Sequence, residues 1–280
     1  MNGLNKKVVK VAVIDLYVGT INQGMRGIRT ILKIFQEKYQ IQFQVDEFEL
    51  RNQLQIPDLS YDIYLSSGGP GSPIEPNLAE WEILYFNWLN NLVLFNERSS
   101  EQDKKFVFFI CHSFQMACRY FKVAEINKRK STAFGVFPVH LINNASEDSM
   151  FKNITDPFYA VDSRDYQATK PALAILDKMG AKILAIEKAR PHVPYERALM
   201  AIRFNRELFG TQFHPEADPE GVIQYLLTEE KKQEVISEHG EAKWQSMIDK
   251  LHDPEKILNT FSTMVPNFIL DALHHKNILQ

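Results

Sequence analysis

One cysteine stands where a strand is expected to end and a helix to begin. Residues 106–110, FVFFI, are apolar throughout, which predicts a short strand buried on both faces. Cys111 follows at once, and a helical pattern starts at about His112. This layout is a nucleophile elbow, in which a thiol attacks a carbonyl while the next backbone N–H stabilises the oxyanion. The alternative interpretation is a buried core cysteine at a strand end.

A thiol nucleophile needs a base, and the base needs a group that orients it. His214 lies in GTQFHPEAD, residues 210–218, directly after a predicted strand. Glu216 stands two residues further on, so in an extended turn it can accept the far ring N–H and leave the other nitrogen facing a thiol. The alternative is a surface turn before a helix, in which Glu216 is only a first-turn acid.

A glycine-rich loop, Ser67-Gly68-Gly69-Pro70, follows a third predicted strand at residues 62–65. Backbone N–H groups in such a turn point outward and can bind a developing oxyanion. An ordinary strand-to-helix loop is the alternative. Phosphate binding is disfavoured, because the loop has no lysine and lacks the spacing of a phosphate-binding loop.

The elements that must position these residues alternate between strand and helix, which indicates a parallel α/β sheet. After residue 122 the pattern changes to short strands and one helical turn. Asp218-Pro219 starts a helix, as does Asp253-Pro254-Glu255, and Pro266 is expected to kink or interrupt the last helix. We expect a catalytic domain over residues 1–230 and a helical extension over 231–280. The predicted strands are 8–16, 41–48, 62–65, 106–110, 133–141, 158–162, 181–187, 198–204 and 208–213, and the predicted helices are 21–38, 80–97, 173–179 and 255–274.

Composition excludes several classes of protein. The 280 residues are 45% hydrophobic and 24% charged, which is typical of a soluble globular protein. A formal net charge of −3 implies no general attraction to nucleic acid or to an anionic membrane. Two cysteines are too few for a disulfide framework, and no secretory signal or membrane-spanning run is apparent. We therefore expect a cytoplasmic protein, and no motif indicates a metal or another cofactor.

Taken together, the SGGP loop, a strand-end cysteine with Gln115 four residues on, and G-x-Q-F-H-P-E resemble the class I glutamine amidotransferase family. The closest resemblance is to stand-alone members related to the glutaminase domain of GMP synthase. Residues 134–139, FGVFPV, are similar to a strand of that subgroup, and the resemblance covers roughly residues 8–228. It implies a doubly wound, mostly parallel α/β sheet with flavodoxin-like layering, followed here by the C-terminal helices.

The resemblance also implies roles. Glutamine would form a γ-glutamyl thioester on the cysteine and release ammonia, and water would then release glutamate. The ammonia would go to a separate synthase or acceptor-domain partner, or the enzyme is a plain hydrolase, since about fifty residues after the matched region cannot house a synthase domain. The implied residues are Cys111 as nucleophile, His214 as base and then acid, Glu216 as orienter, the N–H groups of Gly69 and His112 as oxyanion hole, and Gln115, Gly68, Ser163 and Arg164 as substrate-binding residues.

The sequence departs from the family pattern at the elbow and at one late strand. Phe109 and Ser113 replace the glycines that usually flank the nucleophile, and Ser163 replaces a histidine. Two interpretations of this stretch stay open: Arg164 and Asp165 recognise a different substrate, or Arg164 forms a structural ion pair with Asp165 or another acid. These departures keep three alternatives open: a γ-glutamyl peptide hydrolase, an acyltransferase like the homoserine succinyltransferases, and an inactive regulatory or binding relative.

Overall fold

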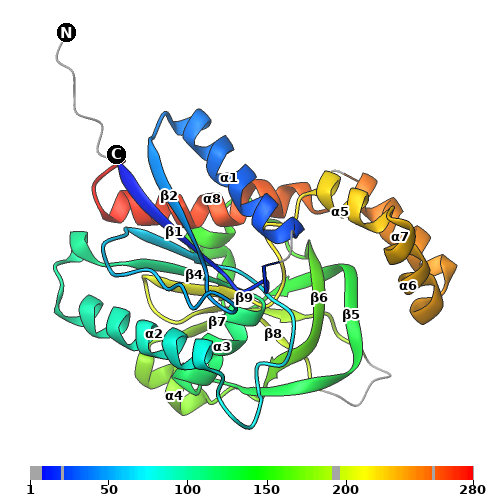
Figure 1. The fold of residues 1–280 in the computed structure, drawn as a ribbon, viewed down its shortest axis with the longest axis horizontal. Helices are drawn as coiled ribbons and strands as arrows, with labels where there is room; N and C mark the ends of the chain where they lie inside the picture. Colours follow the sequence, from blue (N-terminus) through cyan, green and yellow to red (C-terminus); the bar gives the residue numbers. More distant parts are fainter. Residues whose placement is uncertain (1–7, 20–21, 191–195, 254–255, 280) are drawn as a thin grey trace.

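The computed structural model describes residues 8–19, 22–190, 196–253 and 256–279. Within these residues, nine strands form one sheet in the order β2-β1-β3-β4-β9-β8-β7-β5-β6 (Figure 1). The first five strands in this order are parallel to one another. They are β2 (Phe43–Glu49), β1 (Val9–Asp15), β3 (Ile63–Ser66), β4 (Phe106–Ile110) and β9 (Leu208–Thr211).

The other four strands are antiparallel to their neighbours. They are β8 (Leu199–Arg203), β7 (Lys182–Glu187), β5 (Glu125–Leu141) and β6 (Phe158–Thr169). The sheet therefore combines a doubly wound parallel half with an antiparallel half, which confirms the expected α/β fold class. The expected strands 133–141 and 158–162 are only parts of β5 and β6, because paired polar residues such as Asn127 and Gln167 continue the ladder.

Helices cover both faces of the sheet, and alternate residues of the strands pack against them. Val11 and Val13 of β1 belong to one core cluster, with α1 (Gln23–Tyr39) and α8 (Leu258–His275). Ala12 and Ile14 belong to the opposite cluster. That cluster includes α2 (Glu80–Arg98), α3 (His112–Phe121) and α4 (Leu173–Met179). Figure 1 shows α1 and α8 on one side of the parallel strands and α2 to α4 on the other.

A third cluster lies outside the antiparallel half. Val136 of β5 and Val161 of β6 pack there against three short helices. These helices are α5 (Pro219–Leu226), α6 (Glu229–His239) and α7 (Glu241–His252). Asp218 caps α5 by accepting the Gly221 N–H at 2.9 Å, which agrees with the expected helix start.

The last helix differs from its prediction. Residues 254–255, where the Asp253-Pro254-Glu255 start was expected, lie outside the described residues, and α8 begins at Leu258. It runs through Pro266 without interruption. Proline removes the hydrogen bond to the carbonyl four residues earlier, which belongs to the exposed Ser262, so water can replace the lost donor. Phe268 and Ile269 of α8 are fully buried in the core of the parallel half. The division into residues 1–230 and 231–280 stays a prediction.

In the described part of the chain, every helix is too short or too polar to cross a membrane.

Candidate active site

Cys111 occupies the turn between β4 and α3, at the carboxyl end of the parallel strands. Its backbone has φ 49° and ψ −97°, which a residue with a side chain rarely adopts and which marks a strained functional turn. Its N–H donates to the Thr211 carbonyl of β9 at 2.8 Å. The thiol Sγ lies 3.8 Å from the Ser163 carbonyl oxygen, and the residue is 5% exposed. This geometry is that of a nucleophile elbow.

The two residues that replace the elbow glycines are accommodated in different ways. The Ser113 hydroxyl accepts the Ile110 N–H at 2.8 Å and donates to the Ser66 carbonyl at 2.7 Å, so it ties the turn to β3. Phe109 is fully buried and pairs across the ladder with Gly210 of β9. A methyl group on Gly210 would lie 2.8 Å from the Phe114 Cδ2 and 3.1 Å from the Phe109 Cβ, so the glycine lets β9 lie close to the elbow strand and to α3.

His214 and Glu216 follow β9 and form a buried pair. Glu216 Oε1 lies 2.7 Å from His214 Nδ1, and Glu216 is fully buried. Helix α1 packs directly on this segment, because a methyl group on Gly27 would lie only 1.9 Å from the Glu216 carbonyl oxygen. Burial lowers the pKa of His214, but the charges of Glu216 and Cys111 and hydrogen bonds to both raise it well above its usual value.

Strand β6 runs along the other side of this pair. The His214 N–H donates to the Val161 carbonyl at 2.9 Å, and Val161 and His214 form an isolated antiparallel bridge. Two residues further along, the Ser163 carbonyl contacts the thiol. The antiparallel half therefore contributes one edge of a site whose thiol and imidazole come from the parallel half.

Two side chains that sequence reasoning missed lie at this site. Gln212 is fully buried, and its Nε2 is 3.9 Å from the Cys111 Sγ. A methyl group on Gly68 would lie 3.1 Å from the Tyr17 hydroxyl oxygen, so Tyr17 reaches the same loop, and burial with the charges of Glu216 and Cys111 raises the pKa of Tyr17 well above its ordinary value. The signal for Gln212 was its place two residues before His214, and for Tyr17 its place after β1 at the same edge of the sheet.

The glycine-rich loop lies over the thiol and the imidazole. A methyl group on Gly68 would be 2.8 Å from His214 Cε1 and 3.5 Å from the Cys111 Cβ. Among the described residues no hydrogen bond from the Gly69 N–H is found. His112 is the first residue of α3, so its N–H has no partner within the helix. Neither N–H group is bonded to another backbone group of the described residues in this way, and their assignment to an oxyanion hole stays a prediction.

The His112 side chain is buried. Burial, with the charges of Arg51 and Arg119, lowers the pKa of His112 to about 3. Its ring is packed 5.9 Å from the ring of Trp81, measured between centroids. The imidazole is therefore neutral at physiological pH and supplies no positive charge to the thiol.

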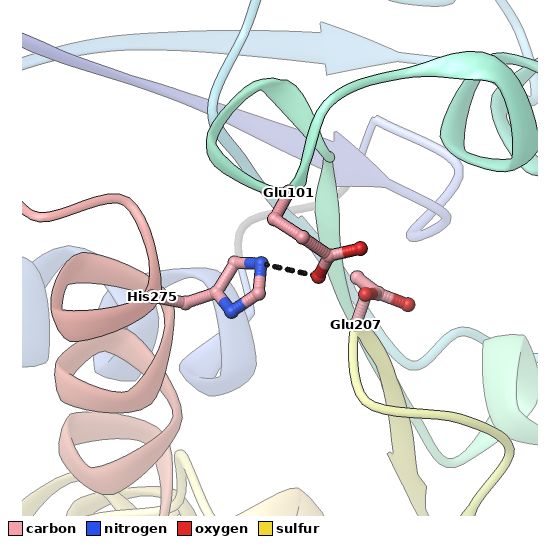
Figure 2. Close-up of side chains that lie close together, drawn as sticks. All are labelled: Glu101, Glu207 and His275. Carbon is pink, nitrogen blue, oxygen red and sulfur yellow. Dashed lines mark ion pairs between the residues drawn. The ribbon is translucent and has the colours of Figure 1, made fainter.

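One group of side chains in the described residues has the ligand types of a metal site. Glu101, Glu207 and His275 each offer an atom within 4.8 Å of the others (Figure 2). His275 Nε2 is 3.3 Å from Glu101 Oε2. Lys104 Nζ, however, lies 2.6 Å from Glu101 Oε1 and 3.4 Å from Glu207 Oε1. Because Lys104 already supplies a cation to both carboxylates, we interpret the group as an ion-pair cluster that holds α8 against the strands.

A family comparison agrees with this geometry. The sequence model of the family "Glutamine amidotransferase class-I" matches residues 27–230, which include Cys111, His214 and Glu216. The chain belongs to the class I glutamine amidotransferase family. Members of this family are cysteine-dependent amidotransferases. No curated protein sequence matches the chain.

Solved structures of glutamine amidotransferases share the fold. A glutamine amidotransferase from Thermotoga maritima is 14% identical with a TM-score of 0.67, and the match covers 95% of this chain and 99% of that one. One from Methylobacillus flagellatus is 15% identical with a TM-score of 0.62, over 95% of each chain. The glutaminase domain of Trypanosoma brucei CTPS, solved with acivicin, is 13% identical with a TM-score of 0.56, over 95% of this chain and 94% of that one. The particular similarity to GMP synthase stays a prediction.

The residues predicted to bind substrate differ in how near they lie to the thiol. Gln115 Nε2 donates to the Tyr166 carbonyl at 3.1 Å and to Gln212 Oε1 at 3.2 Å, which places its amide next to the site. Ser163 is exposed, and its carbonyl reaches the thiol. Arg164 instead donates from Nε to both oxygens of Asp162, at 2.8 and 2.9 Å. Its side chain is 1% exposed, so the structural ion pair is the interpretation that the geometry favours.

Proposed function

We propose that the chain hydrolyses the γ-amide of glutamine, or of a γ-glutamyl compound, through a Cys111-His214-Glu216 triad. The observation that carries this proposal is the 2.7 Å pair of His214 and Glu216 beside the strained Cys111 turn. Glu216 holds the Nδ1 side of the ring, so Nε2 is the nitrogen that exchanges a proton with the thiol. The raised pKa of His214 suits a group that must hold that proton.

The reaction proceeds in two halves. His214 takes the thiol proton, the Cys111 sulfur bonds to the amide carbon, and the N–H groups of Gly69 and His112 stabilise the oxyanion. The carbon–nitrogen bond breaks as His214 gives its proton to the departing ammonia, which leaves a γ-glutamyl thioester. Water, deprotonated by His214, then attacks the thioester. The carbon–sulfur bond breaks, the thiol regains its proton, and glutamate is released, so each turnover consumes one water.

We assign substrate binding to groups around the thiol. The backbone of Gly68 and Ser163 and the amide of Gln115 lie next to it and can hold the γ-glutamyl chain. Arg164 contributes through β6, because its guanidinium is anchored to Asp162 behind the strand. The ammonia passes to a separate synthase partner or is released to solvent.

A different acyl substrate is the second candidate. The exposed Ser163 stands where the resemblance implies a histidine, so this edge of the site differs from the family pattern. Assays with γ-glutamyl peptides, γ-glutamyl amines and acyl-CoA donors separate a γ-glutamyl peptide hydrolase and a succinyltransferase-like enzyme from a glutaminase.

The deciding experiment is ammonia release from glutamine by the wild-type chain, Cys111→Ala and Cys118→Ala. Cys118 is fully buried in the opposite core cluster, so its variant is a matched control for the loss of a buried thiol. We expect release by the wild type and by Cys118→Ala, and none above background by Cys111→Ala. Release that survives in Cys111→Ala contradicts the mechanism. No release from any substrate, with an ordinary thiol rate of Cys111 toward iodoacetamide, identifies an inactive regulatory or binding relative.

A further inference from the structure

A cavity lies in the antiparallel half of the sheet, apart from the thiol of Cys111. Its volume is about 340 Å³, which is within the range of small-molecule sites. Strands β5, β6, β7 and β8 and helix α7 all contribute to its walls. The lining residues that matter for its chemistry are Arg129, Lys188, Arg190 and Lys243, the acids Asp162 and Glu187, and the apolar Phe134, Phe137 and Pro138.

The acids of this cavity are already shared by several arginines. Glu187 Oε1 lies 3.2 Å from Arg129 Nη2 and 3.4 Å from Arg164 Nη2, and its Oε2 lies 2.9 Å from Arg190 Nη2. Arg164, which also binds Asp162, lies behind the lining residues. The two carboxylates therefore interact with three guanidinium groups, so this cluster carries a net positive charge even without Lys188 and Lys243.

Lys188 and Lys243 add two positive charges to the cavity, and neither charge is balanced by a further carboxylate of the described lining residues. Lys188 and Lys243 place their Nζ atoms 5.5 and 4.4 Å from the centre of the Phe137 ring. Neither has a carboxylate partner among the described residues. Burial, with the charges of Lys250 and Lys188, lowers the pKa of Lys243, as expected for crowded cations.

The excess charge is partly removed from water. The side chains of Arg129 and Arg164 are 7% and 1% exposed, and Arg164 Nη1 is buried with no hydrogen-bond partner in the described part of the chain. Buried cations are costly unless an anion and hydrogen-bond acceptors compensate them. A bound anion would supply both, and the rings of Phe134 and Phe137 would cover an apolar or aromatic body attached to it.

We propose that this cavity is a binding site for a small anionic compound, in which a phosphate or carboxylate meets Arg190 and Lys243 and an aromatic or apolar body lies against Phe134 and Phe137. This goes beyond the proposed glutaminase activity and does not depend on it. The cavity shares β6 with the active site, since Asp162 lines it while Val161 and Ser163 on either side contact His214 and Cys111.

The test is calorimetric titration of Cys111→Ala protein, in a buffer free of phosphate and carboxylate. Phenyl phosphate, benzoate and inorganic phosphate are the probes. We expect saturable binding of at least one aromatic anion, more tightly than inorganic phosphate. Preference for phenyl phosphate identifies a phosphate ester as the ligand type, and preference for benzoate identifies a carboxylate. Absence of saturable binding by all three probes overturns the proposal.

Two variants locate the binding. The double variant Arg190→Gln with Lys243→Gln removes two lining cations and should raise the dissociation constant at least tenfold. Lys182→Gln is the matched control, because Lys182 is an exposed lysine of β7 and does not line the cavity. It should change the dissociation constant less than threefold. Equal affinities in wild type and double variant, with both proteins folded by circular dichroism, contradict the assignment.

Discussion

The two halves of the sheet hold their polar groups in opposite ways. At the carboxyl ends of β4 and β9, the thiol of Cys111, the imidazole of His214 and the carboxylate of Glu216 occur once each and are almost closed to solvent. We call these three groups the matched set. In the antiparallel half, one carboxylate is shared by three arginines, with two further lysines nearby. A matched set on rigid strand ends suits proton transfer, which needs fixed distances. An excess of one charge around a cavity suits the binding of an opposite charge.

The largest expected effect tests the matched set. His214→Ala removes the proposed base, and we expect ammonia release from glutamine to fall about 10³-fold. His274→Ala, an exposed histidine of α8, is the control and should release ammonia at the wild-type rate. An equal rate for His214→Ala and wild type would remove His214 from the mechanism.

The next largest effect tests the ion pairs of the antiparallel half. Arg164→Met leaves Asp162 without the ion pair in which one Arg164 Nε–H is shared between both carboxylate oxygens, at a buried position. Breaking such a pair costs about 3–5 kcal/mol, so the urea midpoint should fall clearly. Ser163→Ala, on the exposed neighbour, should change the free energy of unfolding by less than about 0.5 kcal/mol. An unchanged midpoint for Arg164→Met would show that the network is not a structural one.

A smaller effect is expected at the orienting acid. Glu216→Gln keeps the shape of the side chain but removes the charge that raises the pKa of His214, so that pKa should fall. We expect ammonia release to drop about 10- to 100-fold, less than for His214→Ala. Imidazole chemical shifts followed against pH check the pKa directly.

Glu216→Gln should also change how the free energy of unfolding depends on pH. The pKa of His214 is raised in the folded chain, so protonated His214 stabilises the fold fully below about pH 6.5, its unfolded value. That contribution is lost as the pH rises through the folded value. Wild type should therefore exceed Glu216→Gln in stability most at low pH, and a difference that grows with pH would contradict the ion pair.

The smallest effect tests how α1 supports the matched set. Gly27→Ala places a methyl group 1.9 Å from the Glu216 carbonyl oxygen, so α1 must shift. Overpacking of this kind costs about 1–3 kcal/mol. Lys33→Ala, at an exposed position of the same helix, should cost less than about 0.5 kcal/mol. Thermal midpoints of the two variants make the comparison.

Local pattern was informative in the parallel half. The apolar run before Cys111, the loop after β3 and the turn after β9 were recognisable because buried strands are short apolar segments with special turns at their ends. Parallel strands bring those ends to one edge, so the proximity of Cys111, His214 and the glycine-rich loop could be anticipated. The ends of the strands in the antiparallel half could not be predicted in this way, because β5 and β6 continue into polar residues whose partners lie on other strands.

The sequence by itself determined the α/β class, the order of the strands and helices, and the residues able to form a triad, since these depend on local apolar periodicity and on motif spacing. Only the tertiary structure decided that His112 is buried and neutral, that Arg164 faces Glu187 instead of the thiol, and that Gln212 and Tyr17 join the site. It also decided that Gly210 lies directly against Phe114 and Phe109. Burial and charge pairing arise between segments far apart in the chain, so no local window of sequence contains them.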